Sequence, residues 1–406
     1  MAFIKNLNCL QIKKVIRIVF VLFFIIWGHS QACFLYSQTL PIIASHAIRA
    51  DYNTLDNYKN IEKCGFSMAC EYYPSRELAL RHLMTAAKTN VKLIIWCPEI
   101  LTDMENTVRE FSRYKSFGGY LMFDEPEATK FRTVAEEVKK LNKIDNKHYI
   151  WINIFPIYAT LNQLQSISYK QYVDDYIEIV NPSILSFDSY GIKKDGLRSD
   201  YYQNLEIISS SCKQKGISFW AYVLTSQYGN YKTPTKGTLS FQAFNNLAYG
   251  AQGIEYFSYR RILEYGLNMT CAPIDTNYQI MPIYYDVKEL NAEIKYYSRF
   301  FYGCNIKEVT YLGKGIPVGT RQMGNLPASI RIVSYTGNGF LVSYFASGKH
   351  DYLLFVNQDY TKSQELVLET PYKLKRLSYY KRERHKGKGQ ITYLAQPGSI
   401  ILLCLK

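Results

Sequence analysis

The stretch that decides the fold is Gly119-Tyr120-Leu121-Met122-Phe123-Asp124-Glu125-Pro126. Its short apolar run with aromatic residues is typical of a strand that is buried on both faces. Two adjacent carboxylates follow the run directly. Beyond the proline, Phe131–Leu141 carries apolar residues at helical spacing. The segment therefore predicts a strand, a polar loop and a helix in succession.

The same unit recurs along the chain. The other candidate strands are Leu40–His46, Gly65–Cys70, Val91–Cys97, His148–Phe155, Ile184–Asp188, Ile217–Leu224 and Gly253–Phe257. Helical patterns follow the strands. Pro74 opens one of them, and the last is Tyr285–Phe301. Eight β/α units in about 260 residues match the size of a (β/α)8 TIM barrel. The alternative is a doubly wound open sheet, but no glycine-rich phosphate loop follows the first strand. We therefore expect an α/β fold with a catalytic barrel over residues 38–303.

The chain after residue 303 has a different pattern. It contains short runs, several with strand alternation, at Ser329–Ser334, Gly339–Phe345, Tyr352–Asn357, Glu365–Glu369 and Ser399–Leu405. The sequence Thr336-Gly337-Asn338-Gly339 predicts a hairpin turn. We expect a small all-β, sandwich-like domain at residues 304–406, in which the basic segment Lys373–Lys388 forms a solvated hairpin.

The N-terminus has the pattern of a targeting segment. Four basic residues precede the apolar run Ile18–Trp27, which is too short to span a bilayer comfortably and fits a signal-peptide core. Ser30 and Ala32 are small residues at the positions that a signal peptidase reads. Residues 1–32 therefore predict a signal peptide and an exported, periplasmic or cell-surface protein. Cys33 is where a bacterial lipoprotein would carry its lipid, the one membrane attachment that we expect.

Composition excludes several classes of protein. Hydrophobic residues make up 48% and charged residues 20%, which excludes a disordered or coiled-coil chain. The net charge of +14 is interpreted as a solubility feature, because no nucleic-acid motif is present. We expect no nucleic-acid partner.

The nine cysteines include no Cys-x-x-Cys pair. Outside the signal segment we interpret most of them as buried free thiols, with Cys70–Cys97 as the pairing to check. His46, Cys70 and Cys97 could form a metal trio at neighbouring strand ends, but ordinary packing is the favoured interpretation. We expect no metal and no cofactor.

In a TIM barrel the active site lies at the C-terminal ends of the strands. Asp124 and Glu125 close the fourth strand, and adjacent carboxylates are costly to desolvate without a reason. A carboxyl group in an apolar, aromatic site has a raised pKa, which suits a general acid. We therefore predict that Glu125 is catalytic. One carboxylate of this pair can also cap the helix that follows.

Asp188 is the second catalytic candidate. Aligning Ile184–Phe187 with Tyr120–Phe123 matches Asp188 to Asp124, so both would leave the barrel at the same height, two strands apart. Paired carboxylates in this layout suit hydrolysis of a glycosidic bond. The alternative is an aspartate that binds backbone amides in a turn, and both interpretations stay open.

Other strand ends offer groups that bind sugars, either by stacking on a ring face or by hydrogen bonding to hydroxyls. The predicted substrate-binding residues are Asn153, Tyr190, Trp220, Tyr222, Glu99 and His46. Glu255 falls in the middle of its strand, and we interpret it as a structural partner for a buried base.

Four segments of the chain resemble exported bacterial TIM-barrel glycoside hydrolases. They are Gly119–Pro126, Ile152–Pro156, Leu185–Tyr190 and Ala248–Phe257. The resemblance is to the beta-galactosidase-like group near glycoside hydrolase family 42, including many enzymes from gut Bacteroidetes, and Leu353–Asp359 resembles the β-domain that often follows such barrels. A glutamate that closes strand four, usually after Asn, is the acid/base in that clan.

This resemblance implies that Glu125 is the acid/base, with Asp124 in place of the Asn. The clan's nucleophile is a glutamate that closes strand seven, whereas Ile217–Lys236 contains no Asp or Glu. Asp188 is the best substitute.

Two interpretations of the function follow. The first is an exported glycoside hydrolase that cleaves O-glycosidic bonds of an oligo- or polysaccharide, with Glu125 as the acid and Asp188 or Asp124 as its partner. The second is a noncatalytic carbohydrate-binding protein on a degenerate barrel. The paired acids at strand four favour the first, and the missing acid at strand seven favours the second.

Overall fold

The computed structural model describes residues 39–264, 266–327, 329–371, 374–380 and 389–405. The predicted signal peptide, Cys33 and most of Lys373–Lys388 lie outside these ranges. Residues 40–406 form one compact unit. No helix within the described ranges is long and apolar enough to span a membrane.

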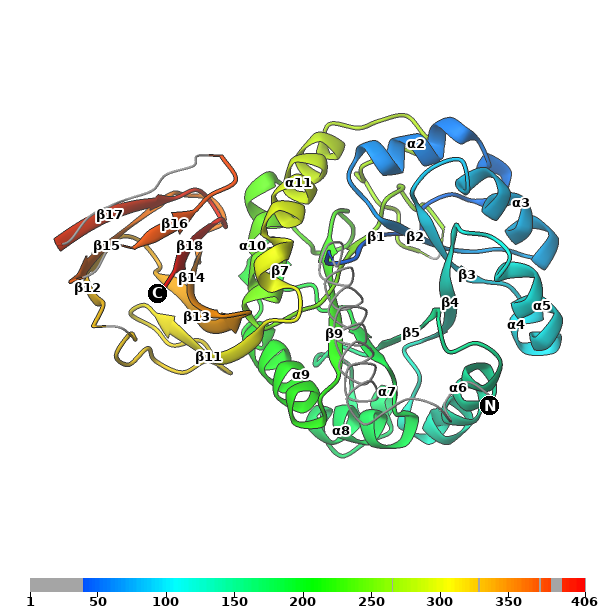
Figure 1. The fold of residues 1–406 in the computed structure, drawn as a ribbon, viewed down its shortest axis with the longest axis horizontal. Helices are drawn as coiled ribbons and strands as arrows, with labels where there is room; N and C mark the ends of the chain where they lie inside the picture. The colour runs from blue at the N-terminus through cyan, green and yellow to red at the C-terminus, as the bar shows by residue number, and fades with distance from the viewer. Residues whose placement is uncertain (1–38, 265, 328, 372–373, 381–388, 406) are drawn as a thin grey trace, which may run out of the picture. The chain divides into compact units, whose positions relative to one another are not determined.

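Eight parallel strands close into a barrel in the order β1-β10-β9-β6-β5-β4-β3-β2 (Figure 1). They are β1 Ile42–Ser45, β2 Met68–Tyr72, β3 Lys92–Trp96, β4 Phe117–Asp124, β5 Tyr149–Ile154, β6 Ile184–Phe187, β9 Ser218–Leu224 and β10 Ile254–Phe257. The pairing of Ile42 with Ile254 joins the first strand to the last. The predicted TIM barrel is therefore confirmed, and the open sheet is excluded.

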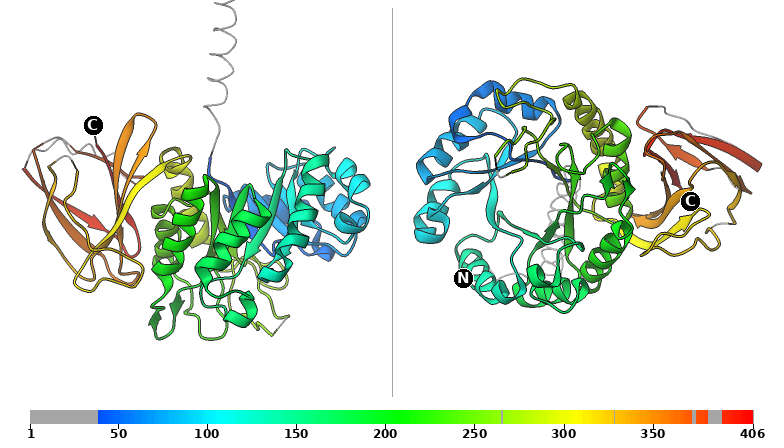
Figure 2. Two further views of the ribbon diagram at one scale, coloured as in Figure 1. Left: turned by 90° about the horizontal axis from the view of Figure 1, so that it is seen from below. Right: turned by 180° about the vertical axis from the view of Figure 1, so that it is seen from behind.

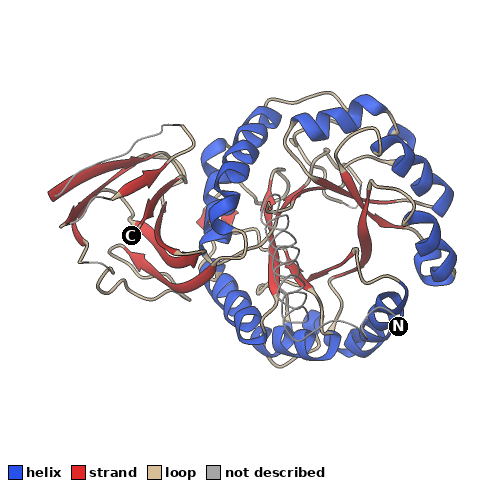
Figure 3. Cartoon of the chain, in the orientation of Figure 1, coloured by secondary structure: helices blue, strands red, loops and turns tan. Residues whose placement is uncertain are grey.

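Helices surround the barrel on its outside (Figures 2 and 3). They are α2 Leu55–Lys63, α3 Arg76–Ala86, α4 Glu99–Thr102, α5 Met104–Phe111, α6 Phe131–Ile144, α7 Leu161–Leu164, α8 Tyr169–Val180, α9 Tyr201–Lys215, α10 Lys236–Ala248 and α11 Ile283–Phe301, with short 3-10 turns at η1 Ala50–Tyr52 and η2 Ala128–Lys130. The predicted apolar stripe of α6 is buried. At α3 the prediction is corrected: Ser75 is the N-cap residue, and its side chain accepts a hydrogen bond from the Leu78 amide, so Pro74 precedes the cap.

The barrel interior is packed rather than hollow. Ile43, Met68, Leu121 and Trp151 belong to its buried cluster. Trp220 lies there too, and an added Cβ at Gly253 would come within 2.5 Å of the indole. Glycine at that position is therefore needed to make room for the ring.

The C-terminal region forms two antiparallel sheets, ordered β11-β13-β14-β18-β16 and β12-β15-β17. Their strands are β11 Asn305–Leu312, β12 Arg331–Tyr335, β13 Phe340–Ser347, β14 His350–Asn357, β15 Gln364–Thr370, β16 Lys375–Leu377, β17 Gly389–Ala395 and β18 Ile400–Cys404. The predicted all-β domain is confirmed. The hairpin at Thr336–Gly339 is wrong, because this turn joins β12 of one sheet to β13 of the other.

Helix α10 connects the barrel to these sheets. The Ser343 hydroxyl donates to the Ala248 carbonyl at 2.8 Å, and the Gln358 amide donates to the Asn245 side chain at 3.2 Å. Helix α11 ends at Phe301 and β11 begins at Asn305. The domain boundary at residues 303/304 stays a prediction.

A small hairpin, β7 Ile192–Lys193 and β8 Gly196–Leu197, follows β6 on the mouth side of the barrel. Cys70 and Cys97 are both free, buried thiols. The candidate disulfide between them therefore does not form.

Candidate active site

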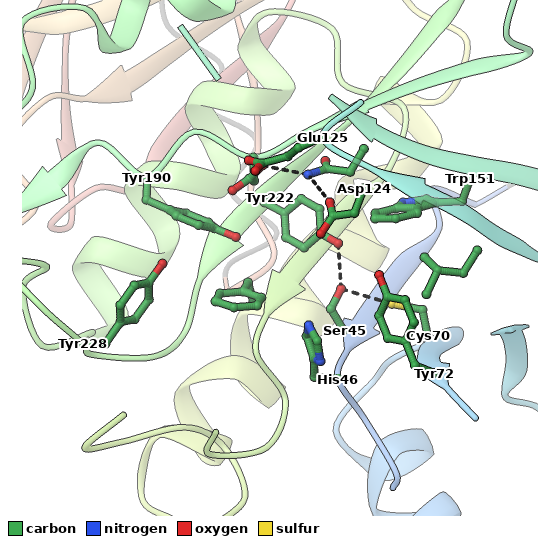
Figure 4. Close-up of a pocket in the computed structure, with 14 residues that line it drawn as sticks. Ser45, His46, Cys70, Tyr72, Asp124, Glu125, Trp151, Tyr190, Tyr222 and Tyr228 are labelled. Carbon is green, nitrogen blue, oxygen red and sulfur yellow. Dashed lines mark hydrogen bonds between the residues drawn. The ribbon is translucent and has the colours of Figure 1, made fainter. Parts of the chain in front are cut away.

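A cavity of about 150 Å³ opens at the C-terminal ends of the barrel strands (Figure 4). The predicted site residues are among its lining, except Trp220 and Glu99. The lining consists of Ser45, His46, Cys70, Tyr72, Leu121, Asp124, Glu125, Trp151, Asn153, Asp188, Tyr190, Tyr222, Tyr228 and Phe257.

The end of β4 places two neighbouring carboxylates in one cavity. Successive side chains of a strand normally point to opposite faces. Glu125 instead has a φ of 48°, in the left-handed region, and its amide donates to the Asn153 carbonyl at 2.8 Å. This turn breaks the alternation, so Asp124 and Glu125 both line the cavity. A non-glycine residue in this conformation costs on the order of 1 kcal/mol or more, which the surrounding structure must offset.

The Asn153 amide joins the two aspartates. Its Nδ2 donates to Asp188 Oδ1 at 2.8 Å and to Asp124 Oδ1 at 3.2 Å. The strand register sets Ser186 level with Asn153 and Asn153 level with Asp124. In a barrel of this type, the residue at a given height shifts by about one position from each strand to the next. Asp188 lies two residues beyond Ser186 and two strands away from Asp124, so the two aspartates lie at the same height. The two aspartates therefore share one hydrogen-bond donor at one level of the mouth.

The three carboxyls have different electrostatic surroundings. Burial raises the pKa of Glu125 well above its usual value, and the charges of Asp188 and Asp124 raise it further. No described residue donates a hydrogen bond to the Glu125 carboxyl. Burial also raises the pKa of Asp188, but the hydrogen bonds from Asn153 and Tyr190 oppose that rise. Of the two, Glu125 is therefore the carboxyl that keeps its proton to higher pH, and Asp188 is the one that ionises first.

Asp124 is the most solvent-exposed residue of the three. It is solvent-exposed, although desolvation of its carboxyl still raises the pKa and the Asn153 hydrogen bond opposes the rise. Exposure to water weakens such effects, so we regard Asp124 as the least perturbed acid.

Aromatic side chains form the walls of the cavity. The ring of Tyr190 stacks on Phe257 at 5.7 Å, and both Tyr190 and Tyr222 are buried. Tyr72 is 40% exposed and ends β2, so its ring is available to stack on a ligand. Tyr72 and Tyr228 were not predicted. The position of Tyr72 at the C-terminal end of a strand was the signal that could have identified it.

His46 lies at the mouth beside Tyr72 and Phe257. Burial lowers its pKa to about 4, and the positive charge of Arg260 lowers it further. The imidazole is therefore neutral at physiological pH and is suited to hydrogen bonding rather than to holding an anion.

Glu99 and Trp220 occupy other places. The Glu99 carboxylate accepts a hydrogen bond from the Arg76 amide at 2.9 Å, so it binds the N-terminus of α3, where an anion is stabilising. Trp220 packs against Tyr149, the first residue of β5, with ring centroids 4.9 Å apart. It fills the barrel near the N-terminal ends of the strands, away from the mouth.

Glu255 lies inside the barrel beneath the cavity and is fully buried. The Trp151 indole donates to its Oε2 at 2.7 Å, and Ser186 Oγ lies 2.6 Å from its Oε1. Tyr222 is a third hydrogen-bond partner. The prediction that Glu255 partners a buried base is therefore wrong, since all three partners are neutral. Burial raises its pKa to about 8.

Residues 217–236 are all described and include no acid. After β9, Thr225, Ser226 and Gln227 are buried and neutral. Across the described ranges, no three His, Cys, Asp or Glu side chains are grouped in a way that would hold a metal ion.

The sequence matches no protein-family model and no curated protein. Among solved structures, the beta-galactosidase from Bacillus circulans sp. alkalophilus is similar with a TM-score of 0.60 and 9% identity, over 91% of this chain and 99% of that one. A catalytic mutant of a family 42 beta-galactosidase from G. stearothermophilus gives a TM-score of 0.61 and 7% identity, over 91% and 98%. The resemblance to TIM-barrel glycoside hydrolases near family 42 is thus confirmed as a shared fold.

Proposed function

We propose that this protein is a glycoside hydrolase that cleaves O-glycosidic bonds of an oligo- or polysaccharide at the mouth of its barrel. The observation that carries the proposal is the convergence of Glu125, Asp188 and Asp124 on one cavity. Glycoside hydrolysis requires two carboxyl groups beside the scissile bond. The cavity of about 150 Å³ is of the size that holds a single six-membered ring.

The surroundings of the carboxyls support distinct roles. Glu125 keeps its proton and donates it to the glycosidic oxygen as the bond from that oxygen to the anomeric carbon breaks. Burial raises the pKa of Asp188 to about 7, and the hydrogen bonds from Asn153 and Tyr190 favour its ionised form. Its negative charge stabilises the oxocarbenium-like charge that develops on the sugar ring. Water supplies the oxygen that bonds to the anomeric carbon and the proton that restores Glu125.

The second candidate function is carbohydrate binding without catalysis. The absence of any Asp or Glu from residues 217–236 favours it, because the resemblance implies a nucleophile at the end of strand seven. In that case the carboxylates would bind sugar hydroxyls.

Export is part of the proposal and rests on the N-terminal sequence pattern. The native protein should begin between about residues 30 and 40, which N-terminal sequencing or intact-mass measurement checks. A retained Met1 would contradict export, and a lipid on Cys33 would establish tethering.

The test of catalysis is a screen of the purified protein against a glycan panel and aryl glycosides. Glu125→Gln should lower hydrolysis of natural glycans on the order of 10²-fold or more. Aryl glycosides with good leaving groups should lose less, because they need less protonation. Glu127→Gln is the matched control, since Glu127 lies two residues further on and its carboxylate accepts from the Thr129 hydroxyl.

The outcomes separate the two functions. Hydrolysis by the parent protein and by Glu127→Gln, with loss in Glu125→Gln, supports the hydrolase. Binding of a glycan without hydrolysis of any substrate would favour the carbohydrate-binding protein. Equal losses on both substrate types would identify Glu125 as a structural carboxylate.

A further inference from the structure

A chain of side chains leads from the barrel interior to the catalytic carboxyls. Glu255 Oε1 lies 2.6 Å from Ser186 Oγ, and Ser186 Oγ lies 3.1 Å from Asn153 Oδ1. The other end of the Asn153 amide donates to Asp124 and Asp188. The members come from β10, β6 and β5, so the chain crosses the barrel below the mouth.

The number of protons decides the direction of these hydrogen bonds. The Ser186 hydroxyl has one proton but two acceptors within reach, Glu255 Oε1 and Asn153 Oδ1. If Glu255 is ionised, that proton goes to the carboxylate, because charge-assisted bonds are the stronger ones. If Glu255 is protonated, Glu255 donates to Ser186, and the Ser186 proton is free for the Asn153 oxygen.

The surroundings of Glu255 favour the protonated form. It is fully buried, and its hydrogen-bond partners Trp151, Ser186 and Tyr222 are all uncharged. Within the described residues no Lys, Arg or His forms an ion pair with it. A buried carboxyl without a cation is most stable when neutral.

The orientation of Asn153 is the consequence at the site. Its Nδ2 has two protons and faces two carboxylate oxygens, while its Oδ1 faces Ser186. Turning the amide over would set its oxygen against both carboxylates. A donor at Ser186 opposes that rotation.

We propose that Glu255 is a positioning residue: by donating its proton to Ser186 it directs the Ser186 hydroxyl to Asn153, and so keeps the Asn153 amide turned toward Asp188. The catalytic meaning of this chain rests on the proposed function. The chain itself is a property of the fold and is testable without a substrate.

The experiment is a titration of Asp188 by NMR in protein labelled with ¹³C at the aspartate carboxyl, with Asp188→Asn to assign the signal. Ser186→Ala removes the donor to Asn153 and should raise the midpoint of Asp188 by up to about one pH unit, because a hydrogen bond to a charged group weakens. Glu255→Met removes only the group that holds Ser186 in place, so Ser186 can still donate to Asn153 and the rise should be smaller. Glu255→Gln is the matched control: its amide donates to Ser186 without a titrating proton, so the midpoint should stay at the parent value.

Apart from Glu255, whose pKa burial raises to about 8, the titrating groups around Asp188 are the same in every variant. The groups that face Asp188 or Glu255 are Asp124, Glu125, Cys70, Tyr158, Tyr169, Tyr190, Tyr222, Tyr228 and Tyr231. Burial raises the pKa of the thiol and of each tyrosine above its usual value, so these groups stay neutral while Asp188 titrates. Asp124 and Glu125 are common to all the variants.

A second measurement uses activity on the aryl glycoside that the parent protein hydrolyses best. The acidic limb of the kcat profile should move to higher pH in Ser186→Ala and remain in place in Glu255→Gln.

An unchanged Asp188 midpoint in Ser186→Ala, or equal shifts in Glu255→Gln and Glu255→Met, would overturn the inference. Should Glu255→Met fail to fold, Ser186→Ala and Glu255→Gln still decide it. Absence of hydrolysis would refute the proposed function, and the titration would still test the chain.

Discussion

The mouth of the barrel has two unlike sides. At the ends of β4 and β6, Asp124, Glu125 and Asp188 gather around one asparagine. At the ends of β9 and β10, hydroxyl groups bind the backbone and one another: the Thr225 hydroxyl donates to the Ser258 carbonyl at 2.8 Å, and the Ser226 and Ser258 hydroxyls lie 3.1 Å apart.

The difference shows at which side of the mouth the fold keeps carboxylates together despite their desolvation and mutual repulsion. In this partly desolvated cavity the charges of Asp188 and Asp124 raise the pKa of Glu125, and that of Asp124 raises the pKa of Asp188. Such shifts are tolerated at functional sites more often than elsewhere. On the β9–β10 side, Thr225, Ser226 and Ser258 are uncharged and are hydrogen-bonded within the protein. We infer that the β4–β6 side performs the chemistry and the β9–β10 side maintains the shape of the mouth.

The largest effect that would sharpen this comparison is expected in Asp188→Asn. The substitution keeps the size of the side chain but removes the charge, which matters mainly in the transition state. We expect turnover to fall on the order of 10²-fold, with ligand affinity changed only a few-fold, as measured by steady-state kinetics and calorimetry. Asp124→Asn should remain much closer to the parent, because Asp124 is exposed.

Near-normal turnover in Asp188→Asn would contradict this assignment. Asparagine is well tolerated in turns, so that result would support the turn interpretation of Asp188. Asp124 would then become the partner of Glu125, and Asp124→Asn should be the inactive variant.

Much of the charged side could be predicted from the sequence. The apolar run before Asp124 marks a buried strand, and the rule that barrel active sites lie at C-terminal strand ends places Asp124, Glu125 and Asp188 together. This inference needs only local patterns and one property of the fold. For the same reason, the ends of all eight strands were predicted closely.

The remaining site predictions depended on the face of the strand to which each side chain points and on its height along the barrel axis. Trp220 and Glu99 lie on or beside the predicted strands, but one packs at the opposite end of the barrel and the other binds a helix terminus. The contacts of Glu255 join residues 69 and 104 positions apart in the sequence. Local patterns carry no information on such pairings. In the same way, Thr336–Gly339 predicts a chain reversal but not which strand is the partner.

A smaller effect concerns stability and pH. The pKa of Glu125 is raised in the folded protein, by burial first and then by Asp188 and Asp124. Its contribution to stability is therefore fully present below its unfolded pKa and is lost as the pH rises through the folded pKa. Glu125→Gln cannot ionise, so its melting temperature should exceed that of the parent increasingly from about pH 5 to about pH 8, by roughly 2–4 °C at the upper end.

Scanning calorimetry over this pH range measures the difference. Glu127→Gln serves as the control, and its difference from the parent should stay constant. A constant difference in Glu125→Gln would show that the carboxyl is well solvated in the folded protein, and the contrast between the two sides of the mouth would lose its electrostatic basis.

The smallest expected effect is on the neutral side, in Thr225→Val. Valine keeps the shape of the fully buried Thr225 but removes the hydroxyl that donates to the Ser258 carbonyl. Loss of this hydrogen bond should lower the free energy of unfolding by about 1 kcal/mol, measured by chemical denaturation, while kcat and KM on the best aryl glycoside stay at the parent values. Ser210→Ala is a suitable control, since that hydroxyl donates to the Ile207 carbonyl on the exposed surface of α9. If Thr225→Val instead lost most of its turnover while its stability stayed unchanged, the comparison would break, because the β9–β10 side would then contribute to the chemistry and not only to the shape of the mouth.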